Sequence, residues 1–198
     1  MLKLSIEEKK NYIVQVATKV FSEKGYKTSS LQDIATRAGL SKAGLYHYFQ
    51  SKDDLLFYII ITHSDNFISI LKKRIKQSED EHLDPEEAFR KLMKVYARHI
   101  NSDGDYRLIV LHERHQLTGD HRDELIKREK TLFQLLRQEL AKISYLNANL
   151  NPNVITFLFI SMSHWLGYWV KEKKDLSLDE IIEQNITAVL HGCLSKRI

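Results

Sequence analysis

The feature that most constrains the fold is a three-residue turn, Gly39-Leu40-Ser41, between two short segments of helical periodicity. Ahead of the turn, Thr28-Ser29-Ser30 supplies N-cap residues. Apolar side chains then recur at the spacing of one helical face: Leu31, Ile34, Ala35 and Ala38. Beyond the turn, Ser41 is the N-cap of a second helix over about 42–48. Helices this short are marginal in water, so packing against the rest of the chain must hold them.

The second segment is an unusual helix because Gly44 costs about 1 kcal/mol relative to Ala in a helix interior. Leu45 and Phe49 are four residues apart and form one packing face, which leaves Lys42, Tyr46 and His47 to point away from it. A Ser5 to Glu8 capping box and Gly25 delimit a longer helix over 6–24 that would support both short ones. A supporting helix, a short helix, a glycine turn and a second short helix together predict a helix-turn-helix.

In a helix-turn-helix the second helix enters the DNA major groove with its N-terminal residues toward the base edges. The small side chains of Ala43 and Gly44 would permit a close approach, and Lys42 would reach guanine acceptors. Hydroxyl, imidazole and cationic groups nearby suit phosphate oxygens. The predicted DNA-binding residues are Thr28, Ser29, Ser30, Gln32, Arg37, Ser41, Lys42, Ala43, Gly44, Tyr46, His47, Tyr48 and Lys52. Taken alone, each of these residues is equally typical of an ordinary protein surface, and Gly44 could simply be a helix position where glycine is tolerated.

Charge is unevenly distributed along the chain. Residues 1–52 contain nine Lys or Arg and four Asp or Glu, whereas the remaining residues contain 21 and 22. A basic N-terminal quarter fits a polyanion partner such as double-stranded DNA, although charge alone fits chance solvated lysines equally well. The alternative function is a helical interaction module whose basic region meets a membrane surface or an acidic protein.

The rest of the chain also reads as helical, because Gly and Pro are few, with seven and two in 198 residues. The predicted fold is therefore all-α, with a helix-turn-helix domain over 1–50 and a ligand-binding and dimerisation domain over 51–198. The predicted helices beyond residue 50 are 51–77, 85–101, 106–117, 121–144, 153–172 and 178–193.

Two features bear on location. Val154 to Val170 is a run of 17 uncharged residues, but it contains serines, a threonine and a histidine and lies at the lower length limit for a membrane span. It predicts a buried helix and no membrane partner. The single cysteine, Cys193, excludes an intramolecular disulfide framework, and the N-terminus lacks a signal-peptide pattern, which together favour the cytoplasm.

Five motifs resemble one protein family over residues 9–55: FSEKGY from 21, LQDIA from 31, AGLSK from 38, LYHYF from 45 and SKDDLL from 51. They are similar to the DNA-binding domain of the TetR family of bacterial transcription regulators. The resemblance implies a homodimer bound to a palindromic operator, usually as a repressor, and released by a small-molecule effector. It also implies that the last two helices of each subunit form the dimer. The helix over 153–172 is apolar on two sides, so it independently needs a second subunit or a ligand cavity for cover.

A weaker resemblance covers the C-terminal half, through LHER from 111, Trp165 four before Trp169, and LSLDEI from 176. These are similar to TetR-type regulators of fatty-acid, steroid and phenylacetate degradation, which respond to acyl-coenzyme A thioesters. An acyl-CoA cavity would use Phe89, Leu92, Met93, Tyr96, Arg107, His112, Arg114, Phe157, His164, Trp165 and Tyr168, with Arg107 or Arg114 near the phosphates. The alternative is that these aromatic residues pack in the hydrophobic core and in the dimer interface and bind no ligand.

Enzymatic and metal-binding functions are poorly supported. The chain has no GxSxG elbow, phosphate-binding glycine loop or paired-histidine zinc motif. His112, Glu113, His115 and His121 have spacings compatible with a metal site, but nine histidines produce such spacings by chance and no cysteine is near. The sequence predicts no enzyme activity, no metal and no cofactor.

Overall fold

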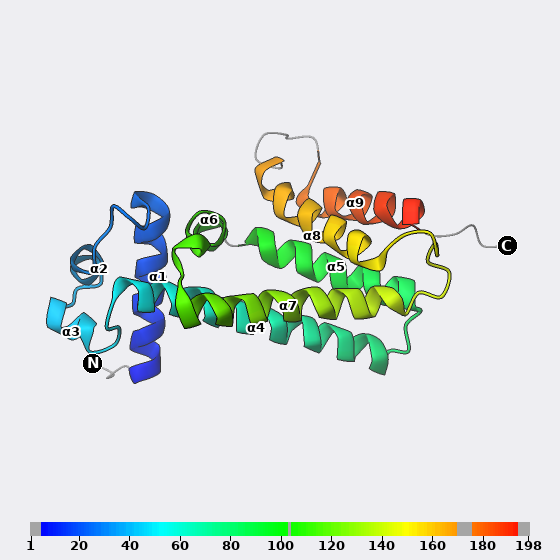
Figure 1. The fold of residues 1–198 in the computed structure, drawn as a ribbon. Helices are drawn as coiled ribbons and strands as arrows, with labels where there is room; N and C mark the ends of the chain where they lie inside the picture. The colour runs from blue at the N-terminus through cyan, green and yellow to red at the C-terminus, as the bar shows by residue number, and fades with distance from the viewer. Residues whose placement is uncertain (1–4, 103, 170–175, 194–198) are drawn as a thin grey trace. The chain divides into compact units, whose positions relative to one another are not determined.

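A computed structural model describes residues 5–102, 104–169 and 176–193, and across these ranges it contains helices and no β-strand (Figure 1). The predicted all-α class is confirmed. The helices are α1 (Ile6–Lys24), α2 (Leu31–Arg37), α3 (Lys42–Tyr46), α4 (Lys52–Asp80), α5 (Pro85–Ser102), α6 (Gly104–Glu113), α7 (Gly119–Ala141), α8 (Pro152–Trp169) and α9 (Leu178–Cys193), with a 3-10 turn over Arg114–Gln116.

The N-terminal boundaries follow the capping residues that the sequence contains. Ser5 and Glu8 form a reciprocal capping box at α1, and Ser30 and Asp33 form another at α2. At α3 the Ser41 hydroxyl accepts from the Gly44 N–H at 3.0 Å. Each side chain replaces a hydrogen-bond partner that the first turn of a helix lacks.

Helix ends differ from the predicted ranges by a few residues. The segment expected to be helical over 106–117 ends as an α-helix at Glu113 and continues as a 3-10 turn. The following helix begins at Gly119, whose φ of +52° suits glycine, rather than near 121. The expected helix over 153–172 is described as far as Trp169, and its last three residues lie outside the described ranges.

By packing, the chain divides into an N-terminal unit of residues 1–64 with 104–126 and a C-terminal unit of 65–103 with 127–198. The unit that contains the helix-turn-helix thus includes α6 and the start of α7, beyond the predicted domain 1–50. Its core joins α1, α2, α3 and α4 with Ile109 of α6 and Leu125 of α7. The largest fully buried side chains there are Ile13, Phe21, Ile34, Leu45, Phe49, Leu55, Leu56 and Ile60.

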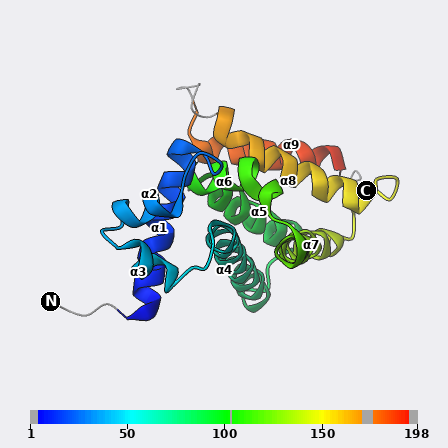
Figure 2. The same ribbon diagram turned by 60° about the vertical axis from the view of Figure 1, so that its left-hand side comes forward.

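The C-terminal unit is built on the mutual packing of α5, α8 and α9, which Figure 2 shows side by side. Phe89 and Phe159 meet edge to face with centroids 5.0 Å apart in its core. Among the described residues, three ion pairs tie α5 to α9 at the surface: Arg98 to Asp179 at 2.7 Å, Arg90 to Glu183 at 3.3 Å and Lys94 to Glu183 at 2.5 Å. Because such exposed pairs contribute little, burial of the apolar faces is the main stabilising term.

Of the described helices, α4 is long and apolar enough by composition to cross a membrane. This is weak evidence, since the core helix of a soluble protein passes the same test. Leu55, Leu56 and Ile60 of α4 are fully buried in the N-terminal core, and Leu71 is fully buried in the C-terminal core. The burial fits a core helix.

Candidate nucleic-acid interface and C-terminal ligand residues

Packing holds α3 in place despite its length of five residues. Leu45 is fully buried and Phe49 nearly so, and both lie in the core that contains Ile34 of α2. The opposite face is free of this packing, with Lys42, Ala43, Tyr46 and His47 exposed. The helix is therefore anchored on one side and presents a polar surface on the other.

Gly44 has a local role that the sequence did not reveal. A Cβ at this position would lie 3.2 Å from the Ser41 Oγ, which is tighter than an ordinary van der Waals contact. That oxygen is the N-cap acceptor of α3. Glycine thus leaves room for the cap in addition to the close approach to DNA predicted from its size.

The predicted DNA-binding residues differ in how free their side chains are. Most are exposed, whereas Gly44, Tyr48 and Lys52 are half-buried and Ser29 is 5% exposed. The Lys42 ammonium lies 5.9 Å from the centroid of the Tyr46 ring, so these two exposed groups of α3 are neighbours. On α2, Gln32 donates to the Thr36 hydroxyl at 3.3 Å. Neither contact removes these groups from the surface.

The serine and threonine hydroxyl groups among the predicted DNA-binding residues already have partners within the protein. Those of Ser30 and Ser41 cap α2 and α3, and that of Thr28 donates to the Lys24 carbonyl. The buried Ser29 hydroxyl donates to the Tyr26 carbonyl at 2.9 Å. In this structure these residues shape the ends of helices, and their contact with DNA stays a prediction.

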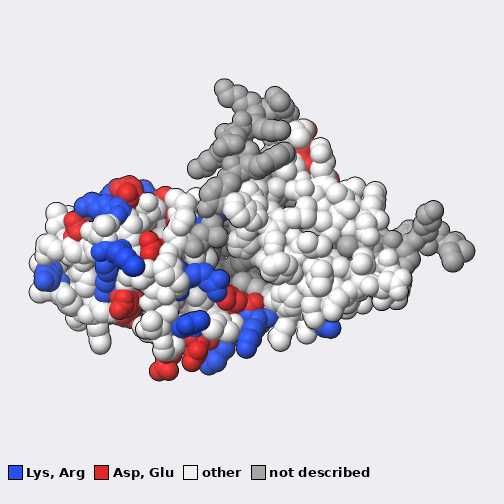
Figure 3. Space-filling model, turned by 45° about the horizontal axis from the view of Figure 1, so that its top comes forward, with Lys and Arg blue, Asp and Glu red and all other residues white. Residues whose placement is uncertain are grey.

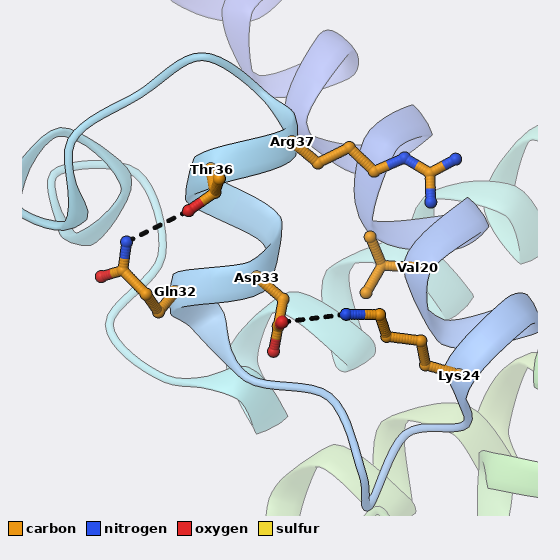
Figure 4. A pocket seen from close by; sticks show the side chains of 6 residues that line it. All are labelled: Val20, Lys24, Gln32, Asp33, Thr36 and Arg37. Atoms are coloured by element: carbon orange, nitrogen blue, oxygen red, sulfur yellow. Dashed lines mark hydrogen bonds and ion pairs between the residues drawn. The ribbon is translucent and has the colours of Figure 1, made fainter.

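Two ion pairs connect α1 and α2 beside a groove of about 320 Å³, and Figure 4 shows the one between Lys24 and Asp33. Arg37 extends toward α1 and binds the Glu23 carboxylate through both terminal nitrogens, which lowers the pKa of Glu23. Lys24 donates to Asp33 at 2.9 Å. Gln32 and Thr36 also line this groove. Arg37 is therefore engaged by its own protein rather than free on the predicted interface.

Asp33 is the most perturbed carboxylate of this group. Hydrogen bonds from Ser30, together with the one from Lys24, lower its pKa to about 2. A carboxylate whose pKa falls on folding stabilises the native state above its unfolded pKa of about 3.8. That contribution disappears as the pH falls from about 4 to about 2, so the capping box of α2 stays ionised at neutral pH.

Lys52 has a structural role that the sequence missed. Its ammonium donates to the Tyr26 carbonyl at 2.7 Å and to the Ser29 carbonyl at 2.8 Å, and it lies 4.4 Å from the centroid of the Tyr26 ring. The Tyr26 hydroxyl donates to Asp53. Burial, reinforced by that bond, raises the pKa of Tyr26. The first turn of α4 therefore holds the loop between α1 and α2.

We expect Lys52→Met, which keeps the aliphatic stem, to lower the free energy of unfolding by roughly 1.5–3 kcal/mol because a charge-assisted pair of hydrogen bonds is lost. Chemical denaturation monitored by circular dichroism measures this. The salt dependence of DNA binding should stay the same. A slope of log K against log salt reduced by about 0.9, with stability unchanged, would instead identify the ammonium as a phosphate contact.

The predicted ligand-binding residues fall into separate groups. Phe89, Leu92, Met93 and Tyr96 of α5 are buried together in the C-terminal core. The Tyr96 hydroxyl and the His164 Nε2 lie 3.2 Å apart, and burial raises the pKa of Tyr96. These five residues share one region, so this part of the predicted ligand wall is contiguous.

The remaining predicted ligand residues are placed differently. Phe157 and Trp165 of α8 are 62% and 69% exposed, so they do not join the buried wall. Arg107, which is buried, and His112 and Arg114, which are exposed, belong to the N-terminal unit. The side chain of Tyr168 lies outside the part of the chain that the structure describes. The ligand-binding role of all these residues stays a prediction.

Family models match both parts of the chain. The model described as "Bacterial regulatory proteins, tetR family" matches residues 13–59, and "Tetracyclin repressor-like, C-terminal domain" matches residues 82–193. The chain belongs to the TetR family. It is a transcriptional regulator with a DNA-binding helix-turn-helix, and members of this family are DNA-binding transcription factors rather than enzymes.

Several relatives of this TetR-family chain are similar over nearly its whole length. The HTH-type transcriptional regulator HbdR of Aromatoleum sp. (strain CIB) is 24% identical over 197 residues, covering 97% of this chain and 83% of HbdR. The HTH-type transcriptional repressor KstR2 of Rhodococcus jostii (strain RHA1) is 20% identical, covering 92% and 90%. The crystal structure of AibR in complex with isovaleryl coenzyme A and operator DNA superposes with a TM-score of 0.75 at 26% identity, covering 91% and 97%.

The histidines of this TetR-family chain do not gather into a metal site within the described residues, where no group of three or more His, Cys, Asp or Glu side chains is suitably placed. Glu113, one of the residues with ligand-like spacing, accepts a hydrogen bond from the Tyr26 N–H at 3.1 Å. Its carboxylate thus contacts the loop ahead of α2.

Proposed function

We propose that this TetR-family regulator is a repressor that binds a palindromic operator as a homodimer and is released by a small-molecule effector of the acyl-CoA class. The observation that carries DNA reading is the construction of α3, where buried Leu45 anchors a helix whose Lys42, Ala43 and Tyr46 face solvent. Operator DNA lies in the cytoplasm of a bacterium, so the proposal includes that location. It also assigns reading to residues 1–50 and effector binding and dimerisation to 51–198.

The apolar face of α8 supports dimerisation. The helix has no Asp, Glu, Lys or Arg, and Val154, Phe157, Leu158 and Trp165 on it are all more than 40% exposed. Figure 3 shows a broad surface of the C-terminal unit without charged side chains. On the N-terminal unit, positively and negatively charged side chains are distributed over the visible surface. Large exposed apolar patches typically mark interfaces. The neighbouring α9 would complete a four-helix bundle with the α8 and α9 of a second copy.

Similarity to AibR, together with the buried aromatic region around Tyr96, supports an acyl-CoA effector. The acyl chain would lie among Phe89, Leu92 and Met93, and the Tyr96–His164 pair would offer hydrogen bonds to its thioester carbonyl. Release needs little movement, because half-sites are about 34–36 Å apart or a multiple of that, and a shift of a few ångströms removes one helix from its groove.

Operator selection from random DNA followed by fluorescence anisotropy tests the proposal. We expect the selected palindrome to bind about 10³–10⁷ times more tightly than random DNA, with affinity falling steeply as salt rises. Isovaleryl-CoA or palmitoyl-CoA should then weaken operator binding, while free coenzyme A should not. Binding without preference for any sequence contradicts the repressor proposal. An operator complex insensitive to both thioesters contradicts the acyl-CoA class alone.

A further inference from the structure

Tyr26 lies at a junction between the helix-turn-helix and two helices outside it. The residue is 4% exposed and sits in the loop that leads from α1 to α2. Lys52 and Asp53 of α4 bind its carbonyl and its hydroxyl. Its remaining polar group, the backbone N–H, donates to the Glu113 Oε1 at 3.1 Å. Two helices thus determine the position of one residue just ahead of α2.

The contact from Glu113 is remote in sequence, because 87 positions separate it from Tyr26. Glu113 is the last residue of α6, and Asp105 near the start of the same helix accepts from the Ser22 hydroxyl at 2.9 Å. Between them, Ile109 is 1% exposed in the N-terminal core. The helix α6 is therefore bonded at both ends to the end of α1 and the loop that follows.

A change in the position of Glu113 would reach α2 directly. Ser29, three residues after Tyr26, donates to the Tyr26 carbonyl, and Ser30 caps α2. With every polar atom of Tyr26 bonded, the loop follows the groups that hold it. In sequence, α6 follows directly on α5, which carries most of the predicted ligand wall: α5 ends at Ser102 and α6 begins two positions later.

We propose that Glu113 is a positioning residue for DNA reading, whose carboxylate couples the end of α6 to the loop ahead of α2. Displacement of α6 on effector binding then moves α2 and α3 away from the reading geometry. The effector step rests on the proposed function, whereas the control of the loop by Glu113 does not. The coupling complements the contacts of α4, which hold the same loop through the carbonyl and the hydroxyl of Tyr26.

Hydrogen exchange of full-length Glu113→Ala tests the contact, with Glu113→Gln as the conservative variant that keeps an acceptor oxygen. Asp123→Ala serves as control, because it removes one exposed carboxylate from the same unit. We expect amide exchange over 26–30 to accelerate at least about 10-fold in Glu113→Ala and to stay within about threefold of wild type in the other two variants. Unchanged exchange in Glu113→Ala overturns the proposal.

Operator affinity with and without isovaleryl-CoA or palmitoyl-CoA tests the coupling. Wild type and Glu113→Gln should lose operator affinity by the same factor on adding the active thioester, whereas in Glu113→Ala this factor should fall toward one. A purely structural role would weaken the operator complex equally with and without thioester, so an unchanged factor overturns the coupling. If neither thioester affects wild type, the effector proposal fails separately, and the exchange result decides whether Glu113 positions the loop.

Discussion

Phe157→Glu is expected to convert the regulator from dimer to monomer at micromolar concentration. Phe157 is 62% exposed on an α8 that has no charged residue, and the proposed interface would bury it against the second copy. A carboxylate there leaves an unpaired charge in an apolar interface, once in each subunit. With aromatic hot spots contributing about 2–4 kcal/mol, the dimer dissociation constant should rise by about 100-fold or more.

Sedimentation velocity at several concentrations measures this change, and operator binding should be lost with the dimer because a single reading head covers one half-site. Phe157→Leu keeps the apolar face and should remain dimeric. Gln138→Glu adds the same charge at an exposed position of α7 and should behave as wild type. A Phe157→Glu protein that stays dimeric and folded would place the dimer interface elsewhere.

Leu45→Ala and Tyr46→Ala are expected to impair DNA binding for different reasons, although the residues are adjacent. Leu45 is fully buried, and its truncation should lower the free energy of unfolding by about 2–5 kcal/mol through lost burial and a cavity. Without that anchor α3 is too short to persist. Tyr46 is 45% exposed, so its removal should change stability by no more than about 0.5 kcal/mol.

Operator affinity should nevertheless fall at least about 10-fold in Tyr46→Ala, because a surface residue of the reading helix loses its contact with DNA. Denaturant titration and anisotropy on both variants separate the two effects. Equal destabilisation of the two proteins, or full operator affinity in Tyr46→Ala, would contradict the division of α3 into an anchoring face and a reading face.

Much of the fold could be predicted because it depends on interactions between residues close in sequence. Capping at Ser5, Ser30 and Ser41 involves partners three residues away, so the helix starts followed from local pattern. The predicted helix ends were less accurate. At Glu113, for example, the α-helix ends and a 3-10 turn follows. The spacing of Leu45 and Phe49 correctly indicated their burial, since helical periodicity alone places both on one face.

Other assignments needed contacts between residues far apart in sequence. Lys52 and Arg37 look like free cations in the sequence, but their partners Tyr26 and Glu23 lie 26 and 14 positions away. Glu113 gave no signal of its contact with the loop, because nothing local distinguishes a carboxylate that accepts a distant N–H from a solvated one. The sequence likewise suggested that Phe157 lines a ligand cavity, whereas in the structure its face of α8 is exposed.

Local pattern was thus sufficient for the family, the all-α class and the face of α3 that meets solvent, since each follows from periodicity, capping and short motifs. Tertiary packing was required to show which polar groups are free and which are bonded within the protein. The physical reason is that a helix boundary depends on hydrogen bonds within a few residues, whereas the availability of a side chain depends on every element folded against it.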